Sequence, residues 1–103
     1  MDEKINIMIV DDEKEIADLV EVYLNNEGYS VCKFYNGTDA LKCAEETELS
    51  LAVLDVMLPD IDGFALLQRL RSRFVFPIIM LTAKVEDMDK IAGLMLGADD
   101  YIT

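Results

Sequence analysis

The chain has 103 residues, of which 52% are apolar, which is enough for one compact domain with a small hydrophobic core. Its 21 acidic and 9 basic residues give a net charge of -12, which disfavours binding to nucleic acid phosphates and to anionic membrane surfaces. The favoured partners are therefore cations and basic protein surfaces.

Short apolar runs alternate with amphipathic segments, which is the pattern of parallel strands joined by crossover helices. Residues 5–10 form the first predicted strand, which is apolar at nearly every position, as expected where helices cover both faces of a sheet. An apolar stripe with helical spacing then predicts a helix that ends near Gly28. Its members are Ile16, Leu19, Val20, Tyr23 and Leu24. Residues 29–35 alternate as a second strand.

Asn36-Gly37 predicts a turn, and Thr38 is the expected cap of a second helix that carries Ala40, Leu41 and Ala44. Three further elements follow: a third buried strand over 51–54, a third helix over 63–73 with Asp62 as its cap, and a fourth strand over 77–81. Asp55 stands at the end of the third strand.

Residues 85–96 predict a fourth helix that Gly97 closes, and residues 100–103 look like the start of a fifth strand. The predicted fold is therefore α/β, with a five-stranded parallel sheet and helices on both of its faces.

Acidic and hydroxyl side chains stand at the ends of three predicted strands. Asp11 and Asp12 end the first strand, Asp55 the third and Thr82 the fourth. The binding crevice of an open α/β sheet lies beyond the carboxyl ends of its strands, so three carboxylates converge if the first and third strands are neighbours. Such a cluster must share protons or recruit a cation, and an open site of this kind suits magnesium together with a phosphate. The sequence thus predicts a magnesium site that handles phosphoryl groups.

Four motifs occur in register along the chain: Asp11-Asp12, LDVMLPDIDG over 54–63, LTA over 81–83 and GADDYIT over 97–103. Together they resemble the response-regulator receiver domain over essentially the whole chain. The resemblance implies a flavodoxin-like sheet with strand order 2-1-3-4-5. The ending DDYIT is most similar to the subclass that carries a winged-helix DNA-binding domain.

The resemblance makes Asp55 the nucleophile that accepts a phosphoryl group from a sensor histidine kinase. It implies Mg2+ as the cofactor, bound by Asp12 directly, by Asp11 through water, by Asp55 and by the backbone carbonyl of Met57. Such a chain is a phosphoacceptor that catalyses its own phosphorylation and dephosphorylation, not a turnover enzyme.

The resemblance also implies a switch and an output surface. Thr82 would donate its hydroxyl to the phosphoryl group, and Tyr101 would follow it as the switch aromatic. Lys90, Asp99 and Asp100 match positions that form ion pairs in a homodimer built on the predicted fourth helix and fifth strand. Transcription would then be regulated through an effector domain, and only that domain would contact DNA.

The family pattern calls for a lysine directly after Thr103, then a proline and a fifth helix. We therefore expect residues 1–103 to be a receiver domain that is truncated at its C-terminus. The two cysteines, Cys32 and Cys43, are expected to pack, since two thiols and no histidine cannot supply the usual four zinc ligands. With no signal peptide and no apolar run near 18 residues, a cytoplasmic protein that does not enter a membrane is expected.

Simpler explanations exist for each residue taken alone. An Asp-Asp pair before a helix is more often a cap with a first-turn acid, at odds of about two to one, and Glu13 is assigned to that role. Asp55 alone could be a turn residue. Asp60 and Asp62 are interpreted as solvated loop or cap residues outside the chemical site. The common register of all the motifs reverses these odds for Asp11, Asp12 and Asp55.

Two other classes of function remain open. A magnesium-dependent phosphatase with an aspartyl-phosphate needs a second acid beside its nucleophile, whereas Val56 and Met57 follow Asp55. A phosphorylation-independent interaction module would keep the fold without the switch. Simple assays distinguish these functions. A phosphoacceptor takes up phosphate at Asp55, a phosphatase turns over added phosphoesters, and an interaction module does neither.

Overall fold

The computed structural model describes residues 5–81 and the backbone of residues 100–102. Within these residues the strands are β1 (Asn6–Val10), β2 (Ser30–Phe34), β3 (Leu51–Asp55), β4 (Ile78–Leu81) and β5 (Asp100–Ile102), and the helices are α1 (Lys14–Asn26), α2 (Gly37–Glu46) and α3 (Gly63–Arg71). The five predicted strands and the first three predicted helices are confirmed, with bounds that differ by one or two residues. The predicted helix over 85–96 lies outside the described residues.

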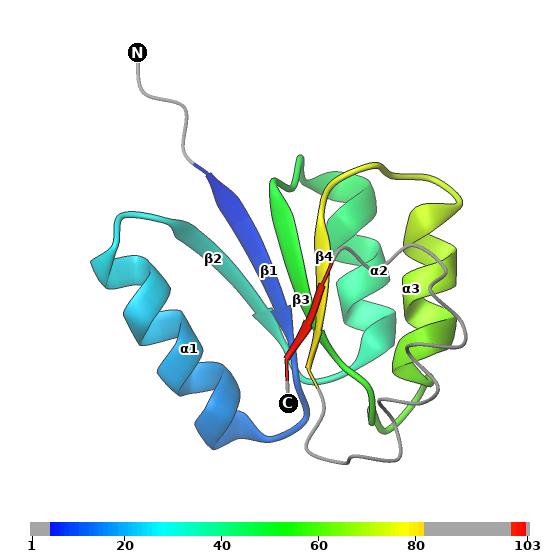
Figure 1. The fold of residues 1–103 in the computed structure, drawn as a ribbon, viewed down its shortest axis with the longest axis horizontal. Coiled ribbons are helices and arrows are strands. Elements are labelled where there is room, and N and C mark those ends of the chain that lie inside the picture. Colours follow the sequence, from blue (N-terminus) through cyan, green and yellow to red (C-terminus); the bar gives the residue numbers. More distant parts are fainter. Residues whose placement is uncertain (1–4, 82–99, 103) are drawn as a thin grey trace.

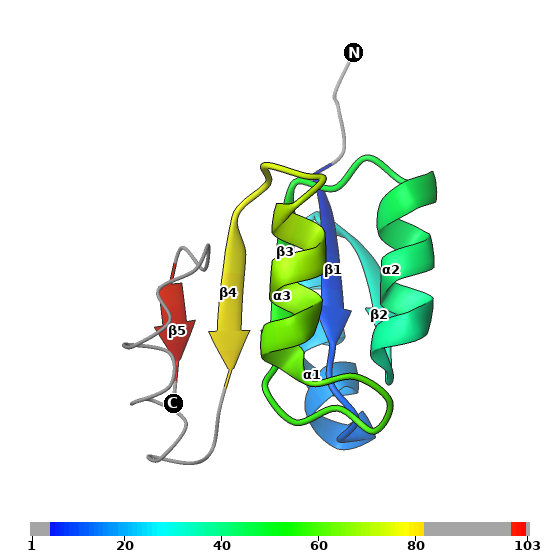
Figure 2. The ribbon, with the colours of Figure 1, turned by 90° about the vertical axis from the view of Figure 1, so that its right-hand side faces the viewer.

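The five strands form one parallel sheet with the order β2-β1-β3-β4-β5, as the resemblance implied. Figure 1 shows α1 on one face of this sheet and α2 with α3 on the other. In Figure 2 the arrowheads of β1, β4 and β5 point toward the same edge. The carboxyl ends of all the strands therefore meet at that edge.

Side chains of β1 point alternately to two apolar clusters, because successive residues of a strand face opposite sides of the sheet. Met8 and Val10 join the larger cluster, under α2 and α3, and Ile7 and Ile9 join the smaller one, under α1. The largest fully buried side chains are Met8, Ile9, Leu54, Leu66, Leu70, Ile78, Met80 and Val10. Both cysteines are free thiols that pack in or against the larger cluster, in agreement with their predicted packing role.

Helix α1 is rotated relative to the predicted apolar stripe. Val20 and Leu24 pack against the smaller cluster as expected, but Ile16, Leu19 and Tyr23 are exposed. The residue of α1 that is fully buried is Ala17. The buried face of the helix therefore centres on the small Ala17, and of the apolar stripe only Val20 and Leu24 pack against the sheet.

The predicted cap of α2 is also wrong. Asn36, not Thr38, is the N-cap residue, and its side-chain oxygen accepts a hydrogen bond from the amide of Asp39 at 2.9 Å. Thr38 lies inside the first turn of the helix and donates its hydroxyl to Asp60. The predicted cap of α3 is confirmed, since Asp62 accepts a hydrogen bond from the amide of Phe64 at 2.7 Å.

Glu13 occupies the N-cap position of α1, but its side chain makes no capping hydrogen bond, and the acid of the first turn is Glu15. The role assigned to the Glu13 side chain is therefore wrong. Its backbone amide instead donates to a carboxylate of the preceding loop, that of Asp11.

Candidate metal centre

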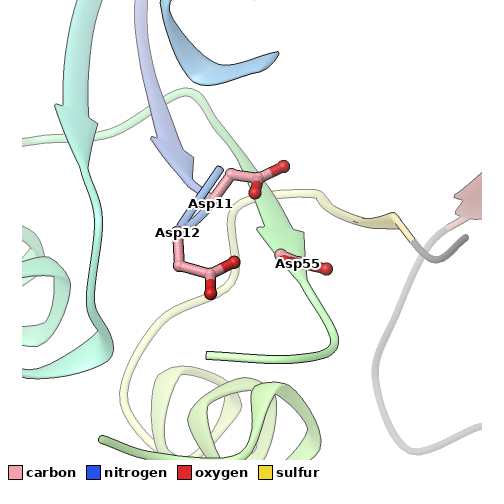
Figure 3. Close-up of side chains that lie close together, drawn as sticks. All are labelled: Asp11, Asp12 and Asp55. Carbon is pink, nitrogen blue, oxygen red and sulfur yellow. The ribbon is translucent and has the colours of Figure 1, made fainter. Parts of the chain in front are cut away.

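The first and third strands are neighbours, and this adjacency builds the site. Val10 of β1 pairs with Leu54 of β3, so the residues that follow each of them emerge side by side at the carboxyl edge of the sheet. One carboxylate oxygen from each of Asp11, Asp12 and Asp55 lies within 4.8 Å of the others. Figure 3 shows the three side chains at the ends of β1 and β3. The predicted convergence of three carboxylates is confirmed.

Backbone hydrogen bonds beyond the strands hold this edge in place. The amide of Asp11 donates to the carbonyl of Phe34 at 3.1 Å, which extends the pairing of β1 with β2. The amide of Val56 donates to the carbonyl of Leu81 at 3.1 Å, which extends the pairing of β3 with β4. The cluster therefore stands on the two central members of four paired strands and not on a free loop, which limits how far its carboxylates can move apart.

Asp11 is the buried member of the cluster, with 4% of its surface exposed. One of its oxygens accepts a hydrogen bond from the amide of Glu13 at 2.9 Å, in the short turn that precedes α1. Burial raises the pKa of Asp11, although that hydrogen bond opposes the rise, and the charge of Asp12 adds to it. Asp12 is exposed, so it is the member that solvent reaches most easily.

Asp55 is half-buried and is the last residue of β3, directly before the loop that leads to α3. Burial raises its pKa to about 7, the charge of Asp11 contributes next, and a hydrogen bond from the amide of Met57 at 3.4 Å opposes the rise. The cluster therefore holds a proton near neutral pH unless positive charge is supplied.

The donor set matches a hard divalent cation. The three side chains offer only oxygen ligands, and one of them, Asp12, is exposed to water. A cation would relieve the mutual repulsion of the three carboxylates. The group thus fits Mg2+, which takes one or two carboxylates and keeps several waters.

The loop after Asp55 folds back tightly against it. The amide of Gly63 donates to the carbonyl of Val56 at 2.9 Å, and a Cβ atom at Gly63 would lie 2.2 Å from the carbonyl oxygen of Asp55. Only a glycine fits this approach. The exposed Met57, whose carbonyl is a predicted ligand, lies at the start of this loop.

Asp60, interpreted from the sequence as a solvated loop or cap residue, caps a helix, but not the one that follows it in the chain. Its carboxylate accepts hydrogen bonds from the amides of Gly37 and Thr38 and from the hydroxyl of Thr38. These bonds lower its pKa to about 2, the Thr38 hydroxyl contributing most. Asp60 thus caps α2, a helix 22 residues earlier in the chain, and no local pattern indicates such a contact.

The remaining predicted site residues lie outside the part of the chain whose side chains the structure describes. Thr82 follows Leu81, which pairs with Asp55, but Thr82 itself lies outside the described residues, as do Lys90 and Asp99. Tyr101 and Asp100 are described by backbone alone, as members of β5. Their predicted functions stay predictions.

Comparison with known proteins identifies the family. Residues 7–103 match the family described as "Response regulator receiver domain". Because this match covers nearly the whole chain, the chain belongs to the receiver-domain family of response regulators.

Three similar proteins illustrate the relationship. The chain is 65% identical over 97 residues to "Regulatory protein VanRc" of Enterococcus gallinarum and 56% identical over 97 residues to "Regulatory protein VanR" of Enterococcus faecium. In each case the match covers 94% of this chain and 42% of the relative, so the chain spans less than half the length of either.

A solved structure of the response regulator TrrA from Thermotoga maritima, in complex with Mg(2+)-BeF, is 31% identical, with a TM-score of 0.86. The similarity covers 96% of this chain and 85% of that one.

In the part of the chain that the structure describes, no helix is long and apolar enough to cross a membrane.

Proposed function

We propose that this chain is the phosphoacceptor of a two-component system and that Asp55 receives a phosphoryl group from a sensor histidine kinase in a Mg2+-dependent reaction. The observation that carries the proposal is the meeting of three carboxylates, with Asp55 among them, at the carboxyl edge of the sheet. The TrrA structure supports it, since that relative is described in complex with Mg(2+)-BeF.

In the proposed reaction a carboxylate oxygen of Asp55 attacks the phosphorus of the kinase's phosphohistidine. A P–O bond forms, the P–N bond breaks, and the imidazole nitrogen keeps the electron pair of the broken bond, which leaves an acyl phosphate on Asp55. Asp55 must be deprotonated to attack, yet burial and the neighbouring acids raise its pKa to about 7. A bound Mg2+ supplies the positive charge that offsets both the carboxylates and the incoming phosphoryl group.

The ligands we assign to Mg2+ are Asp12 directly, Asp11 through water, Asp55, and the backbone carbonyl of Met57. The exposure of Asp12 and the burial of Asp11 support this division. One oxygen of Asp11 already accepts the amide of Glu13, which leaves the other to hold a water.

The switch and the output belong to the same proposal. Thr82 would donate its hydroxyl to the phosphoryl group and Tyr101 would follow as the switch aromatic. A homodimer would form through Lys90, Asp99 and Asp100, and a winged-helix effector domain in the longer protein would regulate transcription in the cytoplasm. The names of the two enterococcal relatives, both regulatory proteins, support an output of this kind.

Intact mass spectrometry tests the proposal. The chain is incubated with a small acyl phosphate, with Mg2+ or with a chelator, beside an Asp55→Asn variant, and circular dichroism establishes that both are folded. Asp62→Asn is the matched control, because Asp62 lies at the end of the loop that follows Asp55 and caps α3. We expect one added phosphoryl group in the parent and in Asp62→Asn, with Mg2+ only. Uptake by Asp55→Asn would refute Asp55 as acceptor, and no uptake by any folded form would favour the interaction module.

A further inference from the structure

The loop of residues 56–62 connects the phosphoacceptor Asp55 to α3, and its middle is bound to a different helix. One oxygen of Asp60 accepts the amide of Gly37 at 2.8 Å. The other accepts the amide of Thr38 at 2.8 Å and the Thr38 hydroxyl at 2.5 Å. A single carboxylate thus takes three hydrogen bonds from the first turn of α2.

Side-chain packing reinforces this attachment. Ile61 lies directly against Gly37, where an added Cβ atom would be 1.9 Å from Cγ2 of Ile61. At the end of the loop, Gly63 lies against the backbone of Asp55 and Val56. The loop is therefore held at two points after it leaves Asp55: at residues 60 and 61 by α2, and at residue 63 by β3.

Helix α2 does not depend on Asp60 for its own cap. Asn36 accepts the amide of Asp39 and its side-chain nitrogen donates back to the Asp39 carboxylate at 2.9 Å. The amides of Gly37 and Thr38 are two of the donors that the start of a helix leaves without intrahelical partners. Asp60 uses these spare donors, so the contact fixes the loop to the helix at little cost to either.

We propose that Asp60 is a positioning residue of the phosphoryl site: by fixing the loop 56–62 to α2, it holds the backbone at Met57 in the geometry that Mg2+ binding requires. This inference rests on the proposed function. A loop already ordered in the metal-free protein loses less conformational freedom when Met57 becomes a ligand, so metal affinity rises.

The test compares three variants. Asp60→Ala removes all three hydrogen bonds to α2, and Thr38→Val removes the hydroxyl bond alone while keeping the amide. Asn36→Ala is the matched control, because it removes a cap from the same helix but no contact to the loop.

The first readout needs no metal. Amide hydrogen exchange is measured residue by residue in chelator, and we expect Asp60→Ala to speed exchange over residues 57–61 about tenfold or more, as local opening becomes easier. Asn36→Ala should speed exchange only in the first turn of α2.

The second readout is a calorimetric Mg2+ titration. Asp60→Ala should weaken Mg2+ binding about tenfold, which is the low end of the effect on metal affinity of residues that position a metal ligand. Thr38→Val should weaken Mg2+ binding by less. In the Asp60→Ala background, Thr38→Val should have no further effect, since its partner is gone. Phosphorylation by a small acyl phosphate should slow at low Mg2+ and recover at saturating Mg2+.

The outcomes separate this inference from the proposed function. If the parent binds no Mg2+, the proposed function fails and this inference with it. If the parent binds Mg2+ but Asp60→Ala and Asn36→Ala weaken it equally, the effect is one of helix stability and the positioning role is wrong. Unchanged exchange and unchanged affinity in both Asp60→Ala and Thr38→Val would contradict the inference alone.

Discussion

Replacing Asp55 by asparagine should stabilise the metal-free fold, although it removes the proposed acceptor. The folded chain holds three carboxylates within 4.8 Å, and burial together with the Asp11 charge raises the pKa of Asp55 from 3.8 to about 7. A change of that size corresponds to at most about 4 kcal/mol of lost stability at high pH. Because Asp55 is only half-buried, water screens part of the repulsion, and we expect a gain of about 1–2 kcal/mol.

The gain should depend on pH with a definite sign. The pKa of Asp55 is higher in the folded chain than in the unfolded chain, so the folded chain binds a proton between about pH 7 and pH 4 while the unfolded chain does not. The parent therefore regains stability as the pH falls through this window, and the advantage of Asp55→Asn shrinks. Above pH 7 the advantage is complete.

Urea denaturation in chelator at pH 8 and pH 5 measures both effects, with Asp62→Asn as a control for the loss of one negative charge outside the cluster. Adding Mg2+ should reverse the ranking, because the ion binds the parent, with its three carboxylates, more tightly than the variant and so stabilises it more by mass action. An Asp55→Asn variant no more stable than the parent at pH 8 would show that the carboxylates do not strain the fold, and the reasoning on metal recruitment would lose its basis.

Three further substitutions probe the site and the core separately. Asp12→Ala should weaken Mg2+ binding by about tenfold or more, and an unchanged titration would rule out Asp12 as a ligand. Gly63→Ala places a Cβ atom 2.2 Å from the carbonyl oxygen of Asp55, so it should destabilise the fold by about 1–3 kcal/mol and also weaken Mg2+ binding. Unchanged Mg2+ affinity would mean that the metal site does not need the close contact between residue 63 and Asp55. Leu70→Ala, in the fully buried core, should cost about 2–5 kcal/mol in urea denaturation yet leave the Mg2+ affinity of the folded chain unchanged.

The strands and the carboxylate cluster were predictable because their signals are local. An apolar run as short as 5–10 favours a strand with both faces covered over a helix, and an acid directly after such a strand is expected at the carboxyl edge. The convergence of Asp11, Asp12 and Asp55 also needs β1 and β3 to be neighbours, and strand order is not encoded locally. The resemblance to a family supplied that order.

The features that the sequence did not predict are contacts between helices, strands and loops. The apolar stripe of α1 was centred on its large residues, whereas packing against the sheet selects the face with the small Ala17. At α2, the Asn36-Gly37 pair was interpreted as a turn, so Thr38 was predicted as the cap instead of Asn36. The hydrogen bonds of Asn36 with Asp39 nevertheless have the three-residue spacing that is usual for an N-cap. For Asp60 the sequence allowed a loop or cap role but could not indicate which helix it caps, since its partners lie 22 and 23 residues away.

The most direct test of the central claim is to locate the phosphoryl group chemically. The chain is phosphorylated with a small acyl phosphate and Mg2+, then reduced with borohydride, which converts an acyl phosphate of aspartate to homoserine. Peptide sequencing by mass spectrometry then identifies the converted position among the 21 acidic residues. We expect homoserine at position 55 alone and none when Mg2+ is withheld. Conversion at another acid, or conversion at 55 in chelator, would contradict Mg2+-dependent phosphorylation of Asp55.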